Sequence, residues 1–123
     1  ENNQEVIFLT PQEIVKTVIE AARSRKAEDI SILSVASLTT LADYYIICTG
    51  NSNVQLRAIA SSIEEALSKQ GFEPISKEGY RSASWILLDY GSVVAHIFKG
   101  ETRSFYALER LWGDAGRIDP DSF

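Results

Sequence analysis

Few side chains in this sequence are able to do acid–base or nucleophilic chemistry. His96 is the only histidine and Cys48 the only cysteine. A hydrolytic triad, a cysteine nucleophile or a metal site would therefore have to be built on His96, with Asp43 or Asp89 orienting its ring. A histidine on a sheet face that makes a packing or hydrogen-bond contact, or that touches a partner, accounts for the same residue without catalysis. We expect no catalytic site, no metal and no cofactor.

Nucleotide chemistry is a second candidate. Residues Thr49 to Ser52 are predicted to join a strand to a helix, and the N–H groups at a helix N-terminus can bind an anion. A metal-dependent nucleotidyltransferase also needs two carboxylates one residue apart on an adjacent strand, to hold its two metal ions. Asp89 has no acidic residue two positions away, and Glu64 and Glu65 lie on a predicted helix, where neighbouring side chains diverge. A helix capped by Ser52 explains the motif better, and nucleotide transfer or binding is kept as the alternative function.

The composition predicts one acidic domain. The 123 residues, of which 45% are hydrophobic, suffice for one compact domain and leave no room for a second. The 12 basic and 17 acidic residues give a net charge of −5, and the pI is about 4.8. Because proteins that bind phosphate backbones use basic patches, we expect at most minor contact with RNA and a basic protein as the partner.

The expected compartment follows from the same composition. A single cysteine excludes an internal disulfide and fits a reducing compartment. The sequence has no apolar run near the ~20 residues that a membrane span requires, so we expect a soluble, cytoplasmic protein without a membrane partner. The sequence starts at Glu1 and contains no methionine. If a targeting segment was removed, the stroma or matrix of an organelle fits as well.

Trp85–Lys99 gives the clearest β signal and predicts a hairpin. Both arms are rich in β-branched and aromatic residues, and a glycine at the tip allows a tight turn. With the two-residue loop Tyr90-Gly91, Trp85 would pair with His96, whereas a loop one residue longer would change which faces match. One face would carry Trp85, Leu87, Val94, His96 and Phe98, and the other the aliphatic residues Ile86, Leu88, Val93, Ala95 and Ile97.

Three helices are predicted around this hairpin. The first begins with a capping box at Thr10 to Glu13 and runs to about Lys26. The second begins with a capping box at Ser52 and ends at Gly71 in a Schellman motif. A third, short helix would span Glu101–Trp112, where apolar residues recur at helical spacing.

The remaining segments complete one mixed sheet in an α/β domain. Tyr44–Thr49 has no polar alternation at its centre and should be a central strand covered on both faces. Pro74 limits Glu73–Glu78 to a sheet edge, and Asp29–Val35 is the first strand. The expected order is α-β-β-α-β-β-β-α. The predicted divisions are an N-terminal leader over 1–9, the domain over 10–113 and a frayed tail over 114–123.

Four stretches of the sequence form an unusual combination. They are LADYYIICTG at Leu41–Gly50, EGY at Glu78–Tyr80, WILLDYGSVVAHIF at Trp85–Phe98 and RSFYALERLW at Arg103–Trp112. With them, the chain from roughly residue 10 to 114 resembles the ribosomal silencing factor family, also called the Iojap family. Two departures are modest. Ser34 stands where the family often has an acidic residue, and Ala95 replaces a more usual valine.

The resemblance carries expectations for fold and function. It implies a topology similar to that of nucleotidyltransferases, without their catalytic carboxylates. It implies docking on the large ribosomal subunit through ribosomal protein fourteen of that subunit, at the place where the small subunit would join. Translation would then be repressed by steric exclusion rather than by chemistry. An acidic domain with an aromatic side chain on a sheet face suits a basic ribosomal protein.

We predict that the Trp85 face of the hairpin binds this partner. Trp85 lies beside a serine-rich loop and should be partly exposed, and Asp89 either sets the turn or faces a basic side chain of the partner. A homodimerisation module is a third hypothesis, because the same face could pair with a second copy when the protein is free. The predicted partner-binding residues are Glu78, Tyr80, Trp85, Leu87, Asp89, Val94 and His96.

Overall fold

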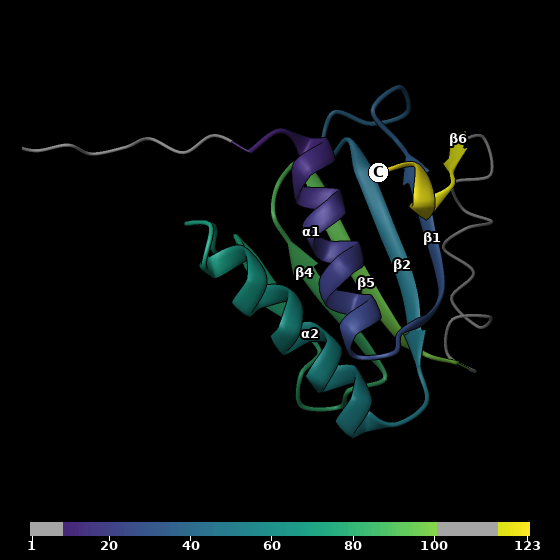
Figure 1. Ribbon diagram of the computed structural model, residues 1–123, viewed down its shortest axis with the longest axis vertical. Coiled ribbons are helices and arrows are strands. Elements are labelled where there is room, and N and C mark those ends of the chain that lie inside the picture. The colour runs from purple at the N-terminus through teal and green to yellow at the C-terminus, as the bar shows by residue number, and fades with distance from the viewer. Residues whose placement is uncertain (1–8, 101–115) are drawn as a thin grey trace, which may run out of the picture.

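A six-stranded sheet covered by two helices forms the framework of the protein (Figure 1). The computed structural model describes residues 9–100 and 116–123. The elements are α1 (Pro11–Ser24), β1 (Glu28–Ser34), β2 (Tyr44–Gly50), α2 (Asn53–Ser68), β3 (Ser76–Glu78), β4 (Trp85–Asp89), β5 (Val93–Lys99), β6 (Gly116–Ile118) and the 3-10 helix η1 (Pro120–Ser122).

The strands follow the spatial order β3-β4-β5-β2-β1-β6. β2 and β5 pair in parallel, and the other neighbours pair antiparallel. The predicted single α/β domain with a mixed sheet is thus confirmed, as are the central position of β2 and the edge position of β3. The helix predicted over 101–112 lies outside the described residues. Neither α1 nor α2, among the described residues, is long and apolar enough to cross a membrane.

The start of α1 is fixed by the predicted capping box. The hydroxyl of Thr10 accepts a hydrogen bond from the N–H of Glu13 (3.2 Å), and the Glu13 carboxylate accepts one from the N–H of Thr10 (2.8 Å). The bond from the N–H of Thr10 is the main cause of a lowered pKa of Glu13, because a hydrogen bond to a carboxylate favours its charged form. The helix then buries one face, made of Ile14, Val15, Val18, Ile19, Ala21 and Ala22.

Both ends of α2 are also capped. The Ser52 hydroxyl accepts a hydrogen bond from the N–H of Gln55 (3.1 Å), while the Gln55 amide oxygen accepts from the N–H of the residue before Ser52 (2.6 Å). At the C-terminal end Gly71 has a φ of +88°. The N–H of Phe72 donates to the carbonyl of Leu67 (2.9 Å), which is the long bond of a Schellman motif. The predicted end of this helix is therefore confirmed.

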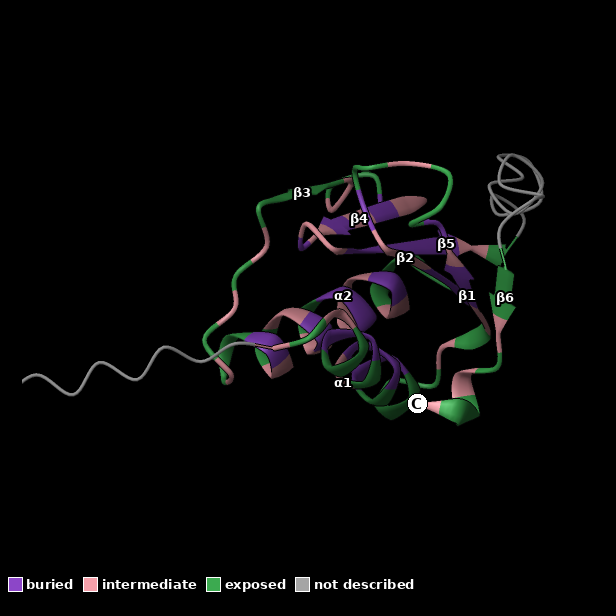
Figure 2. Cartoon of the chain, turned by 90° about the horizontal axis from the view of Figure 1, so that it is seen from above, coloured by how far each residue is buried: buried purple, intermediate pink, exposed green. Residues whose placement is uncertain are grey.

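The two faces of the sheet are buried in different ways. α1 and α2 cover one face (Figure 2), where strand residues such as Ile46, Ile86 and Ile97 join the main core. Side chains alternate along a strand, so their neighbours form a second buried cluster on the opposite face. Its members are Leu33, Val35, Ala42, Ile47, Val94 and Phe98.

The β4–β5 hairpin has the predicted faces but not the predicted register. Trp85 pairs with Phe98 rather than with His96, and the loop is Gly91-Ser92 rather than Tyr90-Gly91. The cause is Tyr90, whose side chain is buried in the helix-side core and whose N–H donates to the carbonyl across the turn. The turn therefore lies one residue later in the sequence than predicted, and each residue of β4 pairs with a residue two positions further along β5. A shift of two residues in the pairing is one full pleat period, so every side chain keeps its face.

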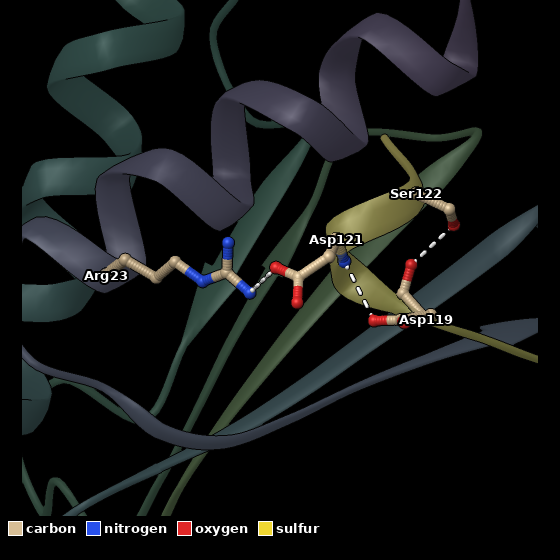
Figure 3. A network of polar contacts seen from close by, with 4 residues as sticks. All are labelled: Arg23, Asp119, Asp121 and Ser122. Carbon is tan, nitrogen blue, oxygen red and sulfur yellow. Dashed lines mark hydrogen bonds and ion pairs between the residues drawn. The ribbon is translucent and has the colours of Figure 1, made fainter.

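The end of the sequence corrects the prediction of a frayed tail. β6 pairs antiparallel with β1 and forms the edge of the sheet. η1 follows, with the Asp119 carboxylate accepting from the N–H of Asp121 (3.0 Å), as Figure 3 shows. The Asp121 carboxylate in turn accepts a hydrogen bond from the guanidinium of Arg23 on α1 (2.8 Å). β1 and Arg23 lie far from this segment in the sequence, so the turn residues near the end of the chain could not predict these contacts.

Candidate docking face

The strand register arranges side chains in rows on the sheet face opposite the helices. From β2 towards β3, the rows are Tyr45, Val94 and Asp89, then Ile47, His96, Leu87 and Glu78, then Thr49, Phe98 and Trp85. Six of the seven predicted partner-binding residues fall in these rows. Together with Tyr45 they form what we call the Trp85 face, which comprises Tyr45, Glu78, Trp85, Leu87, Asp89, Val94 and His96.

Trp85 is fixed by two contacts within the sheet. Its ring stacks on Phe98 of the neighbouring strand, with ring centroids 5.0 Å apart and an interplanar angle of 27°. Its indole Nε1–H donates a hydrogen bond to Nδ1 of His96 (3.1 Å). The side chain is half-buried, as the sequence predicts. Trp85 therefore presents part of an aromatic surface in a fixed orientation.

His96 lies beneath this surface rather than on it. Only 4% of the residue is exposed, and its ring contacts Tyr45 edge to face, with centroids 5.0 Å apart. Burial lowers the pKa of His96 to about 4, because an imidazolium loses its hydration inside the protein. The ring is consequently neutral near pH 7. The structure gives His96 the packing and hydrogen-bonding role that the sequence allows.

Asp89 takes the first of its two predicted roles. Its carboxylate oxygen Oδ1 accepts a hydrogen bond from the N–H of Gly91 (2.8 Å) and so sets the turn. Tyr45 lies in the same row, and its pKa is raised first by burial and then by the negative charge of Asp89. The sequence prediction omitted Tyr45, because its run of residues predicts a strand covered on both faces. Its position near the start of that strand, where residues are less buried, could have indicated partial exposure of Tyr45.

Exposure divides the Trp85 face into a surface and its support. Val94 and His96 are buried, and Glu78 is exposed. The half-buried members are Tyr45, Trp85, Leu87 and Asp89. What the face offers to solvent is thus an apolar and aromatic centre with two carboxylates and no basic group.

Tyr80 does not join the Trp85 face. It packs against the helix-side core, and its hydroxyl donates a hydrogen bond to the carboxylate of Glu64 on α2. Burial and then Glu64 raise the pKa of Tyr80. The amino group of Lys77 lies over its ring, 5.5 Å from the centroid, and also bonds Glu64 (3.2 Å). Tyr80 ties the loop before β4 to the helical layer.

The sheet separates the candidate nucleophile Cys48 from His96. Cys48 is buried in the helix-side core and pairs with Ile97, so its side chain lies on the opposite face from His96. Among residues 9–100 and 116–123, no three His, Cys, Asp or Glu side chains gather to hold a metal ion. At the start of α2, the hydroxyl of Ser52 accepts from the N–H of Gln55 and the amide oxygen of Gln55 accepts from the N–H of Asn51, so side chains of the protein itself bind two of the N–H groups there.

Comparison with known proteins gives one consistent family. The family model described as "Ribosomal silencing factor during starvation" matches residues 9–123. The chain is 40% identical over 113 residues to ribosomal silencing factor RsfS of Bacillus subtilis, covering 92% of this chain and 96% of that protein. It is 31% identical to the mouse protein named "Mitochondrial assembly of ribosomal large subunit protein 1", covering 80% of this chain and 44% of the mouse protein.

A solved structure agrees with these matches. The crystal structure of a protein from Chromobacterium violaceum superposes with a TM-score of 0.83 at 39% identity, covering 85% of this chain and 88% of the other. The fold, the family model and the similarity to the relatives all point the same way. The chain belongs to the ribosomal silencing factor family, a family of translational regulators that includes the Iojap proteins.

Proposed function

We propose that this protein binds the large ribosomal subunit through ribosomal protein fourteen of that subunit and blocks joining of the small subunit. The Trp85 face is the docking surface, and repression results from steric exclusion without a chemical step. Membership of the family supports this function. A mouse relative is also named for assembly of the ribosomal large subunit.

The observation that carries the proposal is the fixed, half-buried indole of Trp85. Aromatic side chains near the centre of an interface contribute much of its binding energy, and tryptophan is enriched among such residues. An indole held in place before binding loses little conformational freedom on docking, which favours affinity. Leu87 and Tyr45 extend the apolar area around it.

Charge supports a basic partner for this surface. Glu78 and Asp89 are the charged members of the Trp85 face, and both are acidic. The whole chain carries a net charge of −5. Complementary charges at the rim of an interface accelerate association and favour the correct partner over others. A basic ribosomal protein meets this requirement, whereas a bare RNA surface would be repelled.

Co-sedimentation with purified large subunits tests the proposal. Trp85→Ala should weaken binding by roughly 2 kcal/mol, or about thirtyfold, and should lose the ability to prevent subunit joining in light scattering. Val54→Ala is the matched control, since Val54 is an exposed apolar residue on α2, in the helical layer, and should bind normally. The same ranking is expected with isolated ribosomal protein fourteen. Normal binding by folded Trp85→Ala would remove the Trp85 face from the function.

A further inference from the structure

We infer that His96 is a positioning residue for docking: it orients the Trp85 indole from beneath and makes no contact with the partner itself. This inference rests on the proposed function, because it assumes that Trp85 is the anchor. The role of this buried polar side chain is to fix the orientation of its neighbour Trp85.

The hydrogen bond between the two side chains determines the tautomer of His96. An indole N–H can only donate, so Nδ1 of His96, at 3.1 Å, must accept with its lone pair. In a neutral imidazole the proton then resides on Nε2. If Nδ1 carried the proton, two donors would face each other and Trp85 would lose its partner.

The same tautomer leaves the other nitrogen of the His96 ring without a hydrogen bond, which lowers the stability of the protein. Nε2 of His96 is buried and has no hydrogen-bond partner among the groups that the structure describes. A buried donor without an acceptor is unfavourable, and an apolar side chain at this position would avoid the penalty. A residue that serves only to fill the core would therefore not need to be a histidine. The gain that offsets the penalty lies at Nδ1, on the bond to Trp85.

The ring contacts explain why a hydrogen bond is needed. Phe98 stacks beneath Trp85 and lies nearly parallel to His96, at 9°. Stacking fixes the plane of the indole, but a ring can still slide or turn within that plane at little cost. A directional bond from its edge removes this freedom. Because burial holds the pKa of His96 near 4, Nδ1 stays free to accept at neutral pH.

Three substitutions at position 96 test whether a hydrogen-bond acceptor is needed there and where it must lie. In His96→Asn the amide oxygen is attached to Cγ, as Nδ1 is, so it can still accept from Trp85. In His96→Gln the oxygen sits one bond further out, near the position of Nε2, and His96→Leu has no acceptor. The direct readout is the NMR signal of the Trp85 indole N–H and its exchange with water, assigned by comparison with Trp85→Phe because Trp112 is the second tryptophan.

In the native protein and in His96→Asn, the Trp85 indole N–H should exchange slowly. In His96→Gln and His96→Leu it should exchange at least about tenfold faster, and large-subunit binding should weaken by about threefold to tenfold, the value of one lost hydrogen bond. Fast exchange in the native protein would overturn the inference, as would an unchanged indole signal in His96→Gln.

The binding measurements distinguish failure of this inference from failure of the proposed function. If His96→Gln and His96→Leu release the indole but bind like the native protein, while Trp85→Ala binds weakly, His96 does not position the anchor and the docking surface stands. If Trp85→Ala itself binds normally, the proposed function fails. If His96→Asn binds as poorly as His96→Leu despite a protected indole, the effect on binding is structural and the inference is wrong.

Discussion

Gly79 lies directly against the backbone of Trp85: a Cβ atom on Gly79 would come within 2.0 Å of the Trp85 carbonyl oxygen. Gly79 also has a φ of +90°, a conformation that favours glycine. Its own carbonyl accepts a hydrogen bond from the N–H of Ala83 (2.8 Å), which closes the loop before β4. The position of the anchor therefore depends on a residue without a side chain.

Gly79→Ala should destabilise the protein by roughly 2–4 kcal/mol, since it combines backbone strain with a clash that only movement of β4 can relieve. Gly71→Ala is the control, because Gly71 has nearly the same φ, +88°, and nothing within 4 Å of the added Cβ. It should cost about 1 kcal/mol. Urea unfolding measures both, and equal losses would contradict the close packing at Gly79.

Reversal of a rim charge should weaken docking in a salt-dependent manner. Glu78→Lys on the Trp85 face and Glu20→Lys on the exposed side of α1 each add two positive charges to the net charge of −5. Only Glu78→Lys should slow association with large subunits, by about threefold to tenfold at low salt, and the difference should shrink as salt rises. Equal effects of the two variants would show that net charge alone matters.

Stability should fall in mild acid because of His96. Its pKa is about 4 when folded and about 6.5 when unfolded, so the unfolded state binds a proton first. The neutral His96 ring contributes up to about 3 kcal/mol to the free energy of unfolding. This contribution is complete above about pH 7 and is lost as the pH falls from 6.5 towards 4. His96 is the only histidine, so His96→Asn should flatten this part of the profile in urea unfolding. Parallel profiles of the two proteins would contradict its burial as a neutral ring.

Tyr80→Phe should affect stability and leave docking intact. The change removes the hydroxyl that donates to Glu64, and losing this bond to a charged group should cost about 1–2 kcal/mol. Tyr44→Phe removes a more exposed hydroxyl, which accepts from the side chain of Gln12 (3.2 Å), and should cost less. Thermal unfolding checks the order. Weak binding by folded Tyr80→Phe would instead return Tyr80 to the docking surface.

The sequence predicted side-chain faces better than it predicted pairings. Side chains alternate between the two sheet faces along Trp85–Asp89, and this alternation can be read from neighbouring residues without knowing the turn. The register depended on whether Tyr90 belonged to the strand, and burial of its ring under the helical layer decided that. Helix ends at Thr10 and Gly71 were predictable, because capping involves neighbours in the sequence.

What escaped prediction depends on residues that meet only in the folded chain. β6 has three residues and no alternation of its own, and its place is decided by the free edge of β1. The membership of Tyr45 in the Trp85 face follows from the alignment of rows across strands, and the exclusion of Tyr80 follows from its contacts with the helical layer. Such contacts between distant residues cannot be predicted from short stretches of the sequence.

The parallel pairing of β2 with β5 has a consequence for the order of folding. It joins Tyr44 to Val93 and Tyr45 to Val94, so the first and last halves of the chain must both be present before the centre of the sheet can close. Contacts between such distant residues form late, because closing the long intervening loop costs entropy first. The Trp85 face takes Tyr45 from one half and Trp85 from the other. A chain still emerging from a ribosome therefore lacks the surface with which the finished protein would bind one.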